Sequence, residues 1–374
     1  MMNIIFIRNV FISKAHYMSC EIQLVKALNM LGHNAKLIGI DDFNEFGKEL
    51  ILLKSPFGKR RYFLLKLFIF LPFYSIIKKI DAVIVDPEII PGTIFLLLLK
   101  KLFSIKVILD VRSIPVEEKL PWDYKLSCKI AQIFFDGATF ITNGTKDYVE
   151  QLVKSRFNKS EIFPSAVNPS IFSPFISNNI SREIKEKVNN RIVFFYHGSI
   201  SPNRGINLIL DAINQIKIKI PNILFVSLSG NNNYIIEYCN SKNYDLDNHL
   251  LLLDLVDHEK VPAYIKLADL CIIPLPKIVW WEISSPLKLM EYLAMEKPII
   301  ISDIEAHRLV VPKDSGFASY FNPDDPEDLE KILIKAISEL DKLKFYAFKG
   351  RKMIFAKYSW DIQARVIENF IIHL

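Results

Sequence analysis

Two series of short apolar runs, each alternating with helix-length segments, constrain the fold of this chain more than any other feature of its sequence. The first series has apolar runs at 4–7, 35–40, 82–85, 106–109 and 138–141, and the second has them at 192–196, 223–228, 250–253, 270–274 and 298–301. Runs that are apolar on both faces are typical of parallel strands covered by helices on either side. We therefore predict an α/β chain with two doubly wound, Rossmann-like sheets.

A proline-containing stretch at 164–174 separates the two series and is typical of a connector. The chain of 374 residues is also too long for a single hydrophobic core. We predict a first domain at 1–170, a second at 171–355, and a helix within 356–374 that either caps the second domain or crosses back to the first. Ligands of such sheets bind beyond the carboxyl ends of the strands, here in a cleft between the domains.

Charge and cysteine content exclude several classes of protein. The chain has 47 Lys and Arg against 41 Asp and Glu, and this mild excess argues against a nucleic-acid-binding surface. Its four cysteines form no CxxC pair and have no histidine at zinc-ligand spacing, so we expect free thiols in a reducing cytoplasm. The apolar run at 4–7 has no charged segment before it and no cleavage site after it, and we interpret it as a strand rather than a signal peptide.

The most informative motif is the stretch 284–298, in which Ser285 and Pro286 predict the capped start of a helix. The free N–H groups and the dipole at such a start favour an anion, and a phosphate or diphosphate is the natural ligand. Lys288 and Glu291 share one helix face, where Lys288 is placed to meet phosphate and Glu291 to accept from vicinal hydroxyls. The alternative is a surface salt bridge between these two residues.

A second anion-binding loop is predicted at 196–206, directly after the first strand of the second series. Gly198 permits close approach of the backbone, and Arg204 beside Gly205 offers a forked donor suited to phosphate. One such loop is weak evidence, because glycine is common in strand-to-helix turns without a ligand. Two loops at the same sheet edge are stronger evidence. His197 is interpreted either as a donor contact or as a hydrogen-bonded structural histidine.

In the order and spacing of these motifs, the sequence resembles the GT-B-fold retaining glycosyltransferases of family 4, the glycosyl transferases group 1. The resemblance is strongest at 197–199 with 204–205, at 269–275, and at 285–294 with 297–300, and weaker matches lie at 8–9, 26–28, 32–33, 110–113 and 358–360. It implies a GT-B fold with two Rossmann-like domains. The acceptor would bind to the first domain and a nucleotide sugar to the second.

Carried over to the matching positions, the resemblance implies that Arg204 and Lys288 neutralise the donor diphosphate and that Glu291 binds the nucleotide ribose. Gly198 would let the donor approach, and the loop 254–258 would meet the nucleobase through backbone groups. The predicted donor-binding residues are Gly198, Arg204, Gly205, Val256, Ser284, Ser285, Leu287, Lys288 and Glu291.

The sequence departs from the family pattern at two places. Ile283 fills a position where members often carry a Glu that holds the donor sugar, and Glu282, one residue earlier, is the candidate to replace it. The loop 8–16 lacks the paired glycines that many members place near the diphosphate, so the resemblance assigns no diphosphate contact to this loop.

The predicted catalytic residues are Asp110, Arg112 and Glu282, and His16 is the acceptor candidate. Asp110 and Arg112 follow the predicted strand 106–109, and a loop-stabilising ion pair is the alternative for each. No cofactor and no divalent metal is expected, because cations and a helix start can stabilise the leaving diphosphate and the donor region has no DxD motif. The pair at 324–325 is interpreted as a helix cap. Retention of the anomeric configuration is implied by the resemblance alone.

An apolar segment at 62–77 lies between basic residues at 59–61 and 78–79. It is shorter than the roughly 20 apolar residues of a membrane-spanning helix and contains Lys66 and Pro72. Basic flanks around such a segment favour shallow contact with an anionic membrane. A second run at 94–103 is similar. The alternative for both runs is a helix buried against the sheet.

Together with the resemblance, these observations predict a cytoplasmic enzyme with peripheral contact at the inner face of the cell membrane. It would move a sugar from a nucleotide sugar to a glycan or lipid-linked acceptor, with retention. Its predicted role is the biosynthesis of a cell-envelope polysaccharide. Two other classes stay open: a GT-B-fold sugar-nucleotide 2-epimerase, and a non-catalytic GT-B partner subunit. Formation of a new sugar nucleotide without an acceptor would identify the epimerase, and failure to bind any nucleoside diphosphate would favour the partner subunit.

Overall fold

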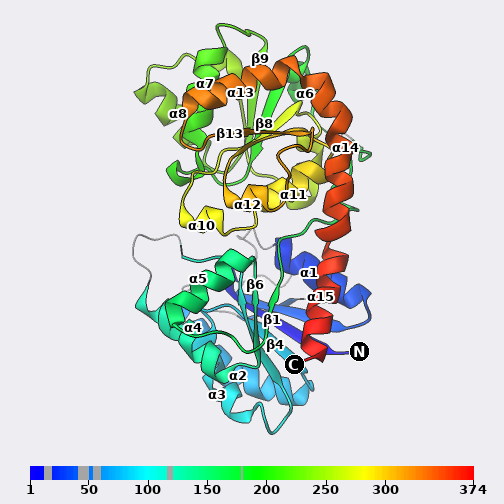
Figure 1. Ribbon diagram of the computed structural model, residues 1–374. Coiled ribbons are helices and arrows are strands. Elements are labelled where there is room, and N and C mark those ends of the chain that lie inside the picture. The colour runs from blue at the N-terminus through cyan, green and yellow to red at the C-terminus, as the bar shows by residue number, and fades with distance from the viewer. Residues whose placement is uncertain (12–18, 41–49, 54–59, 116–120, 178–179) are drawn as a thin grey trace. The chain divides into compact units, whose positions relative to one another are not determined.

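The computed structural model describes residues 1–11, 19–40, 50–53, 60–115, 121–177 and 180–374, which form two compact units (Figure 1). The first unit comprises Met1–Ala166, Ile283–Ser285 and Trp360–Leu374, and the second comprises Val167–Glu282 and Pro286–Ser359. Each unit contains one parallel sheet with helices on both faces. The predicted α/β class with two doubly wound sheets is therefore confirmed.

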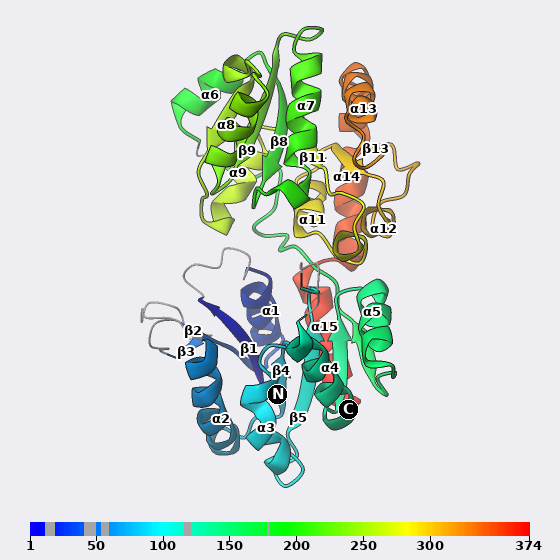
Figure 2. The same ribbon diagram turned by 90° about the vertical axis from the view of Figure 1, so that its left-hand side faces the viewer.

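In the first unit, the strands that the structure describes form one sheet in the order β3-β2-β1-β4-β5-β6-β7. They are β1 (Asn3–Phe11), β2 (Asn34–Ile40), β3 (Leu50–Leu52), β4 (Ala82–Val85), β5 (Lys106–Val111), β6 (Gly137–Phe140) and β7 (Ser160–Ile162). One face is covered by α1 (Ser19–Met30) and α15 (Trp360–Ile372). The other is covered by α2 (Arg60–Ile77), α3 (Ile90–Leu99), α4 (Trp122–Phe134) and α5 (Asn143–Val153) (Figure 2).

Alternating side chains of β1 explain why its sequence is a continuous apolar run. Ile4 and Phe6 pack with α1 and α15, whereas Ile5 and Ile7 pack with the helices of the opposite face. Both faces of the sheet therefore need apolar residues.

Two strands of the first unit are longer than predicted. β1 continues to Phe11 through residues 8–11 of the predicted loop 8–16, and β5 continues to Val111. Asp110 therefore lies within a strand instead of after it. The reason is an ion pair inside the unit: the buried guanidinium of Arg8 on β1 binds the carboxylate of Asp110 on β5. Two polar residues thus extend strands whose apolar runs have already ended.

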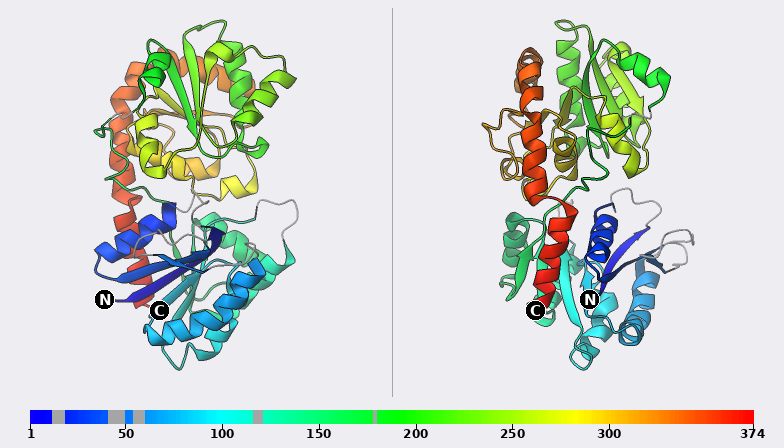
Figure 3. Two further views of the ribbon diagram at one scale, coloured as in Figure 1. Left: turned by 180° about the vertical axis from the view of Figure 1, so that it is seen from behind. Right: turned by 90° about the vertical axis from the view of Figure 1, so that its right-hand side faces the viewer.

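In the second unit, the described strands form one sheet in the order β10-β9-β8-β11-β12-β13. They are β8 (Ile192–His197), β9 (Ile223–Leu228), β10 (Leu250–Leu253), β11 (Leu270–Ile273), β12 (Ile299–Ser302) and β13 (Ala318–Phe321). One face packs with α7 (Ile206–Ile216), α8 (Asn232–Ser241) and α13 (Pro326–Ser338). The other packs with α9 (Val261–Ile265), α11 (Leu287–Ala294) and α14 (Leu340–Lys357), and α14 lies against α11 (Figure 3). A further helix, α6 (Arg182–Val188), precedes β8.

Short helical segments follow the carboxyl ends of several strands of the second unit. They are the 3₁₀ turns η4 (Pro202–Arg204) after β8 and η6 (His258–Lys260) after β10, and the helices α10 (Val279–Glu282) after β11 and α12 (Glu305–Arg308) after β12. Another 3₁₀ turn, η5 (Asp247–His249), precedes β10. The carboxyl ends of parallel strands share one edge of a sheet, so side chains from these segments are available to a single site.

The C-terminal helix α15 belongs to the first unit, where it packs against α1 and its Trp360 ring lies 6.3 Å from that of Phe163. Asp325 caps α13 by accepting from the backbone N–H of Asp328, which confirms the interpretation of 324–325. The four cysteines are free thiols, as predicted. Of the helices that the structure describes, none has the length and apolar character to cross a membrane.

Candidate functional site

Two glycines with positive φ shape the loop after β8. A Cβ on Gly205, whose φ is +72°, would lie 1.8 Å from the carbonyl oxygen of Pro274, so only glycine fits between this loop and the end of β11. Gly198 has a φ of +108°, but a Cβ there would lie 3.5 Å from Nζ of Lys288, an ordinary contact distance. The backbone at Gly198 therefore passes beside Lys288.

The ammonium group of Lys288, in the first turn of α11, is buried and has no hydrogen-bond partner among the described residues. Its Nζ lies 3.9 Å from the centre of the Tyr196 ring. Burial, together with the nearby Arg204 guanidinium, holds the pKa of Lys288 well below its ordinary value, and Glu291 opposes this shift. A buried cation without a partner costs free energy unless an anion joins it.

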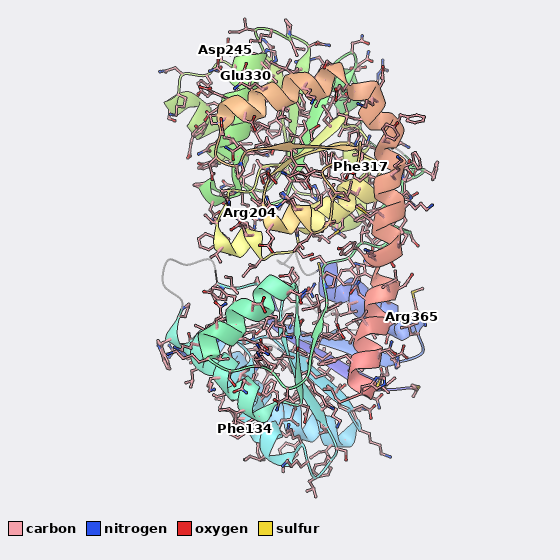
Figure 4. The ribbon with its side chains drawn as sticks, viewed as in Figure 1. Phe134, Arg204, Asp245, Phe317, Glu330 and Arg365 are labelled. Carbon is pink, nitrogen blue, oxygen red and sulfur yellow. The ribbon has the colours of Figure 1, made fainter. Side chains whose placement is uncertain are left out.

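Arg204 reaches the same tyrosine from the end of η4, near α10 (Figure 4). Its guanidinium lies 4.8 Å from the centre of the Trp281 ring and beside the Tyr196 hydroxyl. Trp281 is itself fixed, because its Nε1 donates to the carbonyl of Asn203 at 2.7 Å. Two cations from different elements, η4 and α11, therefore flank Tyr196. Such a pair suits a diphosphate, which accepts hydrogen bonds from several directions.

The predicted serine cap of α11 is wrong. The helix begins at Leu287, and Pro286 at the N-cap position provides no side-chain hydrogen bond. Ser285 belongs to the first unit, where its hydroxyl accepts from the backbone N–H of Ser165 at 3.2 Å and its carbonyl accepts from the Ser165 hydroxyl at 2.8 Å. The backbone N–H of Leu289 donates to the Pro286 carbonyl at 3.1 Å. Because no side chain caps the helix, the N–H groups of Leu287 and Lys288 are available to an anion.

Glu291, one turn further along α11, lies between two histidines. Its Oε2 is 2.7 Å from Nε2 of His197, and its Oε1 is 2.7 Å from Nε2 of His258. Burial alone would raise the pKa of Glu291, but the two imidazole hydrogen bonds outweigh it and lower this pKa to about 2. Glu291 is therefore an anion at neutral pH. Neither Lys288 nor Glu291 lies at the surface, which contradicts the alternative of a surface salt bridge.

The other predicted donor residues are placed differently. Val256 lies half-buried against the core in the loop between β10 and η6, and Leu287 opens α11. Glu282 is half-buried at the end of α10. Ser284 and Ser285 are grouped with the first unit. The structure thus brings Gly198, Arg204, Lys288 and Glu291 together around β8 and α11 in the second unit.

In the first unit, Asp110 has the geometry of the ion-pair alternative. It is 1% exposed, its Oδ2 accepts from the Arg8 guanidinium, and its Oδ1 accepts from the Thr139 hydroxyl at 2.8 Å. Arg8 donates further to Glu21 at 3.1 Å. Both oxygens of Asp110 are therefore engaged inside the unit.

Arg112 donates to the carbonyl of Phe163 and lies 4.3 Å from the centre of its ring. A small cavity beside it is lined by Arg8, Glu21, Asp110, Arg112 and Trp360, among other residues. His16, the acceptor candidate, lies outside the described residues.

Two residues near these clusters had not been selected as site candidates from sequence. Asp86 follows β4, and burial raises its pKa to about 6 although the Arg8 guanidinium lowers it. Its signal is an Asp-Pro step directly after an apolar run. His258 ends the loop 254–258 that the resemblance places near the nucleobase, but its contact with Glu291, 33 positions away, has no local signal.

Two doubly wound units are the architecture of the GT-B fold, and the cationic pair lies beside the sheet of the second unit. Residues 177–353 match the family of glycosyl transferases group 1. The predicted resemblance is therefore confirmed as far as the glycosyl transferases group 1, and the matched residues include Gly198, Arg204, Lys288 and Glu291. No curated protein sequence matches the chain significantly.

Solved structures share the fold over the whole chain. Sucrose-phosphate synthase from Thermosynechococcus elongatus is 15% identical, with a TM-score of 0.79 over 100% of this chain and 99% of that one. A glycosyltransferase from Rickettsia africae is 16% identical, with a TM-score of 0.78 over 100% and 98%. HepE from Anabaena, in complex with UDP-glucose, is 13% identical, with a TM-score of 0.76 over 100% of both chains. At these identities the likeness establishes the fold alone.

Proposed function

We propose that the protein transfers a sugar from a nucleotide-diphosphate sugar to a glycan or lipid-linked acceptor, with retention of the anomeric configuration, in cell-envelope polysaccharide biosynthesis. The observation that carries the proposal is the pair of cations at Tyr196, of which Lys288 is buried without a partner. The retaining mechanism rests on the family resemblance. The Anabaena protein is known in complexes with UDP and UDP-glucose, so uridine nucleotides are the first donors to test.

Cleavage of a sugar–phosphate bond leaves negative charge on the diphosphate. Arg204, Lys288 and the uncapped N–H groups of α11 are already in place for that charge, so little reorganisation is needed as it develops. Burial strengthens these interactions relative to water. We expect them to act without a divalent cation.

Calorimetric titration with UDP, GDP and ADP tests the donor site. We expect one of them to bind the wild type, and Arg204→Ala and Lys288→Met to weaken that binding about 10- to 100-fold, the usual loss for a hydrogen bond to a charged group. Lys349→Met is the matched control, because Lys349 also lies over a tyrosine ring, that of Tyr346 at 4.3 Å, but is exposed. Absence of binding by the wild type, or unchanged binding by Lys288→Met, contradicts the proposal.

A second measurement separates transfer from epimerisation. Incubation of the protein with the bound sugar nucleotide, in the absence of any acceptor, should yield no new sugar nucleotide. Appearance of an epimer would instead identify the alternative of a sugar-nucleotide epimerase.

The proposal includes contact with an anionic membrane through one surface of the first unit. On α2, one side is fully buried through Phe63, Leu67 and Leu71, while the opposite side is exposed. The exposed apolar residues, here called the α2–α3 surface, are Leu65, Ile69, Phe73, Ile77, Ile94, Leu98 and Leu102, which are between 44% and 76% exposed. The two alternatives for 62–77, membrane contact and burial against the sheet, thus each describe one side of the same helix.

The two halves of the α2–α3 surface are continuous. Gly92 brings α3 close to α2, since a Cβ there would lie 3.1 Å from Cβ of Leu67. The Phe95 ring lies 5.5 Å from that of Phe68 and 6.4 Å from that of Phe73. Contiguous apolar patches of this kind are uncommon on soluble monomers and mark interaction sites.

Charge favours lipid as the partner of this surface. Arg61, Lys78, Lys79 and Lys101 are exposed around it, and no Asp or Glu occurs in 60–80 or 89–109. Apolar side chains beside clustered cations are the composition that binds shallowly to anionic bilayers.

Flotation with vesicles tests this contact. We expect binding to vesicles that contain phosphatidylglycerol but not to pure phosphatidylcholine, and loss of binding in the triple variant Leu65→Ser, Ile69→Ser, Phe73→Ser. The control variant Ile218→Ser, Leu309→Ser, Phe345→Ser replaces apolar residues of the second unit that are at least as exposed as the three test residues. If the wild type stays unbound, or both triple variants lose binding equally, the membrane part of the proposal is wrong.

A further inference from the structure

The two histidines that bind Glu291 are not equivalent. Both give the Nε2 hydrogen to the carboxylate, each at 2.7 Å. Since Glu291 is an anion that cannot donate, each imidazole in its neutral form carries its proton on Nε2 and has a lone pair on Nδ1. The partner of Nδ1 therefore decides whether both ring nitrogens of the histidine have hydrogen-bond partners within the protein.

His197 is complete. Its Nδ1 lies 3.0 Å from the hydroxyl oxygen of Tyr292, and that oxygen accepts from the backbone N–H of His197 at 3.1 Å. The Tyr292 hydroxyl thus donates to Nδ1 while accepting from the backbone. Burial lowers the pKa of His197, which keeps this ring neutral. Every polar atom of the ring has a partner.

In His258, one ring nitrogen lacks a hydrogen-bond partner within the described parts of the chain. Its Nδ1 has no hydrogen-bond partner among the residues that the structure describes, and its ring packs at 5.1 Å against that of Phe172. Its side chain is 23% exposed, whereas that of Glu291 is 2% exposed. The group of three therefore presents one open acceptor atom toward solvent, and that atom is Nδ1 of His258.

We propose that His258 is a further donor-binding residue, whose Nδ1 accepts a hydrogen bond from a ribose hydroxyl of the nucleotide. Glu291 holds the imidazole in the required tautomer and orientation, as carboxylates do for histidines elsewhere. The position fits the proposed donor site: Lys288, about one helical turn before Glu291, is the proposed diphosphate contact, and in a nucleotide sugar the ribose is attached to that diphosphate. This inference rests on the proposed function.

Two substitutions separate a ligand contact from a purely structural role. His258→Gln places an amide nitrogen near the position of Nε2, so it keeps a donor to Glu291 and removes the acceptor at Nδ1. His258→Asn places its amide oxygen near the position of Nδ1, so it keeps an acceptor there and gives up the contact with Glu291. If His258 contacts the ligand, His258→Gln should be the substitution that impairs recognition of the ribose. If His258 has only a structural role, His258→Asn should be the one that does.

Calorimetric titration with UDP, 2′-deoxyUDP and 3′-deoxyUDP provides the readout, with the guanosine or adenosine set used if one of those nucleotides is the ligand. For the wild type, we expect at least one deoxy analogue to bind about tenfold more weakly, the typical value of one hydrogen bond. In His258→Gln this ratio should fall toward one, and in His258→Asn it should persist. Thermal unfolding of both variants shows whether either has lost its fold.

Three results would overturn the inference. The wild type does not distinguish the deoxy analogues, or His258→Gln distinguishes them as the wild type does, or His258→Asn alone loses the distinction. The proposed function survives all three, because diphosphate binding would persist. If the wild type binds no nucleoside diphosphate at all, the proposed function and the inference fail together.

Discussion

Replacing Lys288 by methionine should stabilise the second unit while removing its ability to bind a nucleoside diphosphate. The ammonium group is buried, has no hydrogen-bond partner among the described residues, and lies within reach of the Arg204 charge. Methionine has a similar length and no charge. The substitution therefore removes an uncompensated cation and keeps most of the contact with the Tyr196 ring.

The magnitude follows from two opposing terms. Replacing buried charged groups by apolar ones of similar volume often stabilises a protein by about 1 to 4 kcal/mol. Loss of the cation–π contact, at 3.9 Å from the centre of the Tyr196 ring, costs about 0.5 to 2 kcal/mol. We expect a net gain of about 1 to 2 kcal/mol, which raises the Tm by about 2–8 °C for a unit of this size.

The stability difference between Lys288→Met and the wild type should also depend on pH in a defined direction. The folded pKa of Lys288 lies below its unfolded value of 10.5, so the unfolded state binds the proton more tightly. The penalty is largest below the folded pKa and disappears as the pH rises toward 10.5. The stability advantage of Lys288→Met should therefore shrink between pH 7 and pH 10.

Differential scanning calorimetry of the ligand-free proteins, with Lys349→Met as the exposed control, measures the effect. If Lys288→Met unfolds at a lower temperature than the wild type, or if its advantage grows as the pH rises, the account of Lys288 as an unpaired buried cation is refuted.

Three further predictions concern substitutions at four positions. Gly205→Ala should lower the Tm of the second unit sharply, because the added Cβ meets the Pro274 carbonyl. Gly198→Ala should cost about 1 to 2 kcal/mol of stability for its positive φ and should chiefly weaken nucleotide binding. Measuring both the Tm and the Kd of each variant checks this difference. Asp110→Asn should destabilise the first unit, by up to about 3 kcal/mol, because the buried Arg8 guanidinium loses one carboxylate partner and keeps Glu21, and an unchanged urea midpoint would contradict the ion-pair role of Asp110. Glu291 contributes stability that is present above its ordinary pKa of 4.5 and is lost as the pH falls toward 2, so urea midpoints should fall less between pH 7 and pH 3.5 in Glu291→Gln than in the wild type.

The central strands of both sheets could be predicted from sequence, because strands buried on two faces must be apolar throughout. Among the described edge strands, β10 was predicted at 250–253, whereas β3, β7 and β13 were not. β7, with the residues Ser160–Ile162, is exposed enough to need no apolar run, and β3 has only three residues. The central strand β1 was predicted too short for a different reason: its polar residue Arg8 is buried by a partner 102 positions away.

The candidate donor site shows the same limit. Gly198, Arg204, Lys288 and Glu291 are recognisable because each belongs to a local motif at a strand end or a helix start. The histidine contacts to Glu291 span 94 and 33 positions and have no local pattern. The wrong cap of α11 has the same cause, since the Ser285 hydroxyl finds Ser165, 120 positions away, and leaves the helix end open.

The membership of α15 in the first unit bears on how the protein is made. Trp360, Ala364 and Ile367 complete the core beneath β1 and α1, and a Cβ on Gly137 would lie 2.7 Å from the Phe370 ring. During synthesis, the ribosome finishes the whole second unit before it adds these residues. One face of the sheet in the first unit therefore stays partly uncovered until the second unit has been synthesised. Truncation before Trp360 would leave that face open, so a chaperone-dependent first unit beside an intact second one is the expected result.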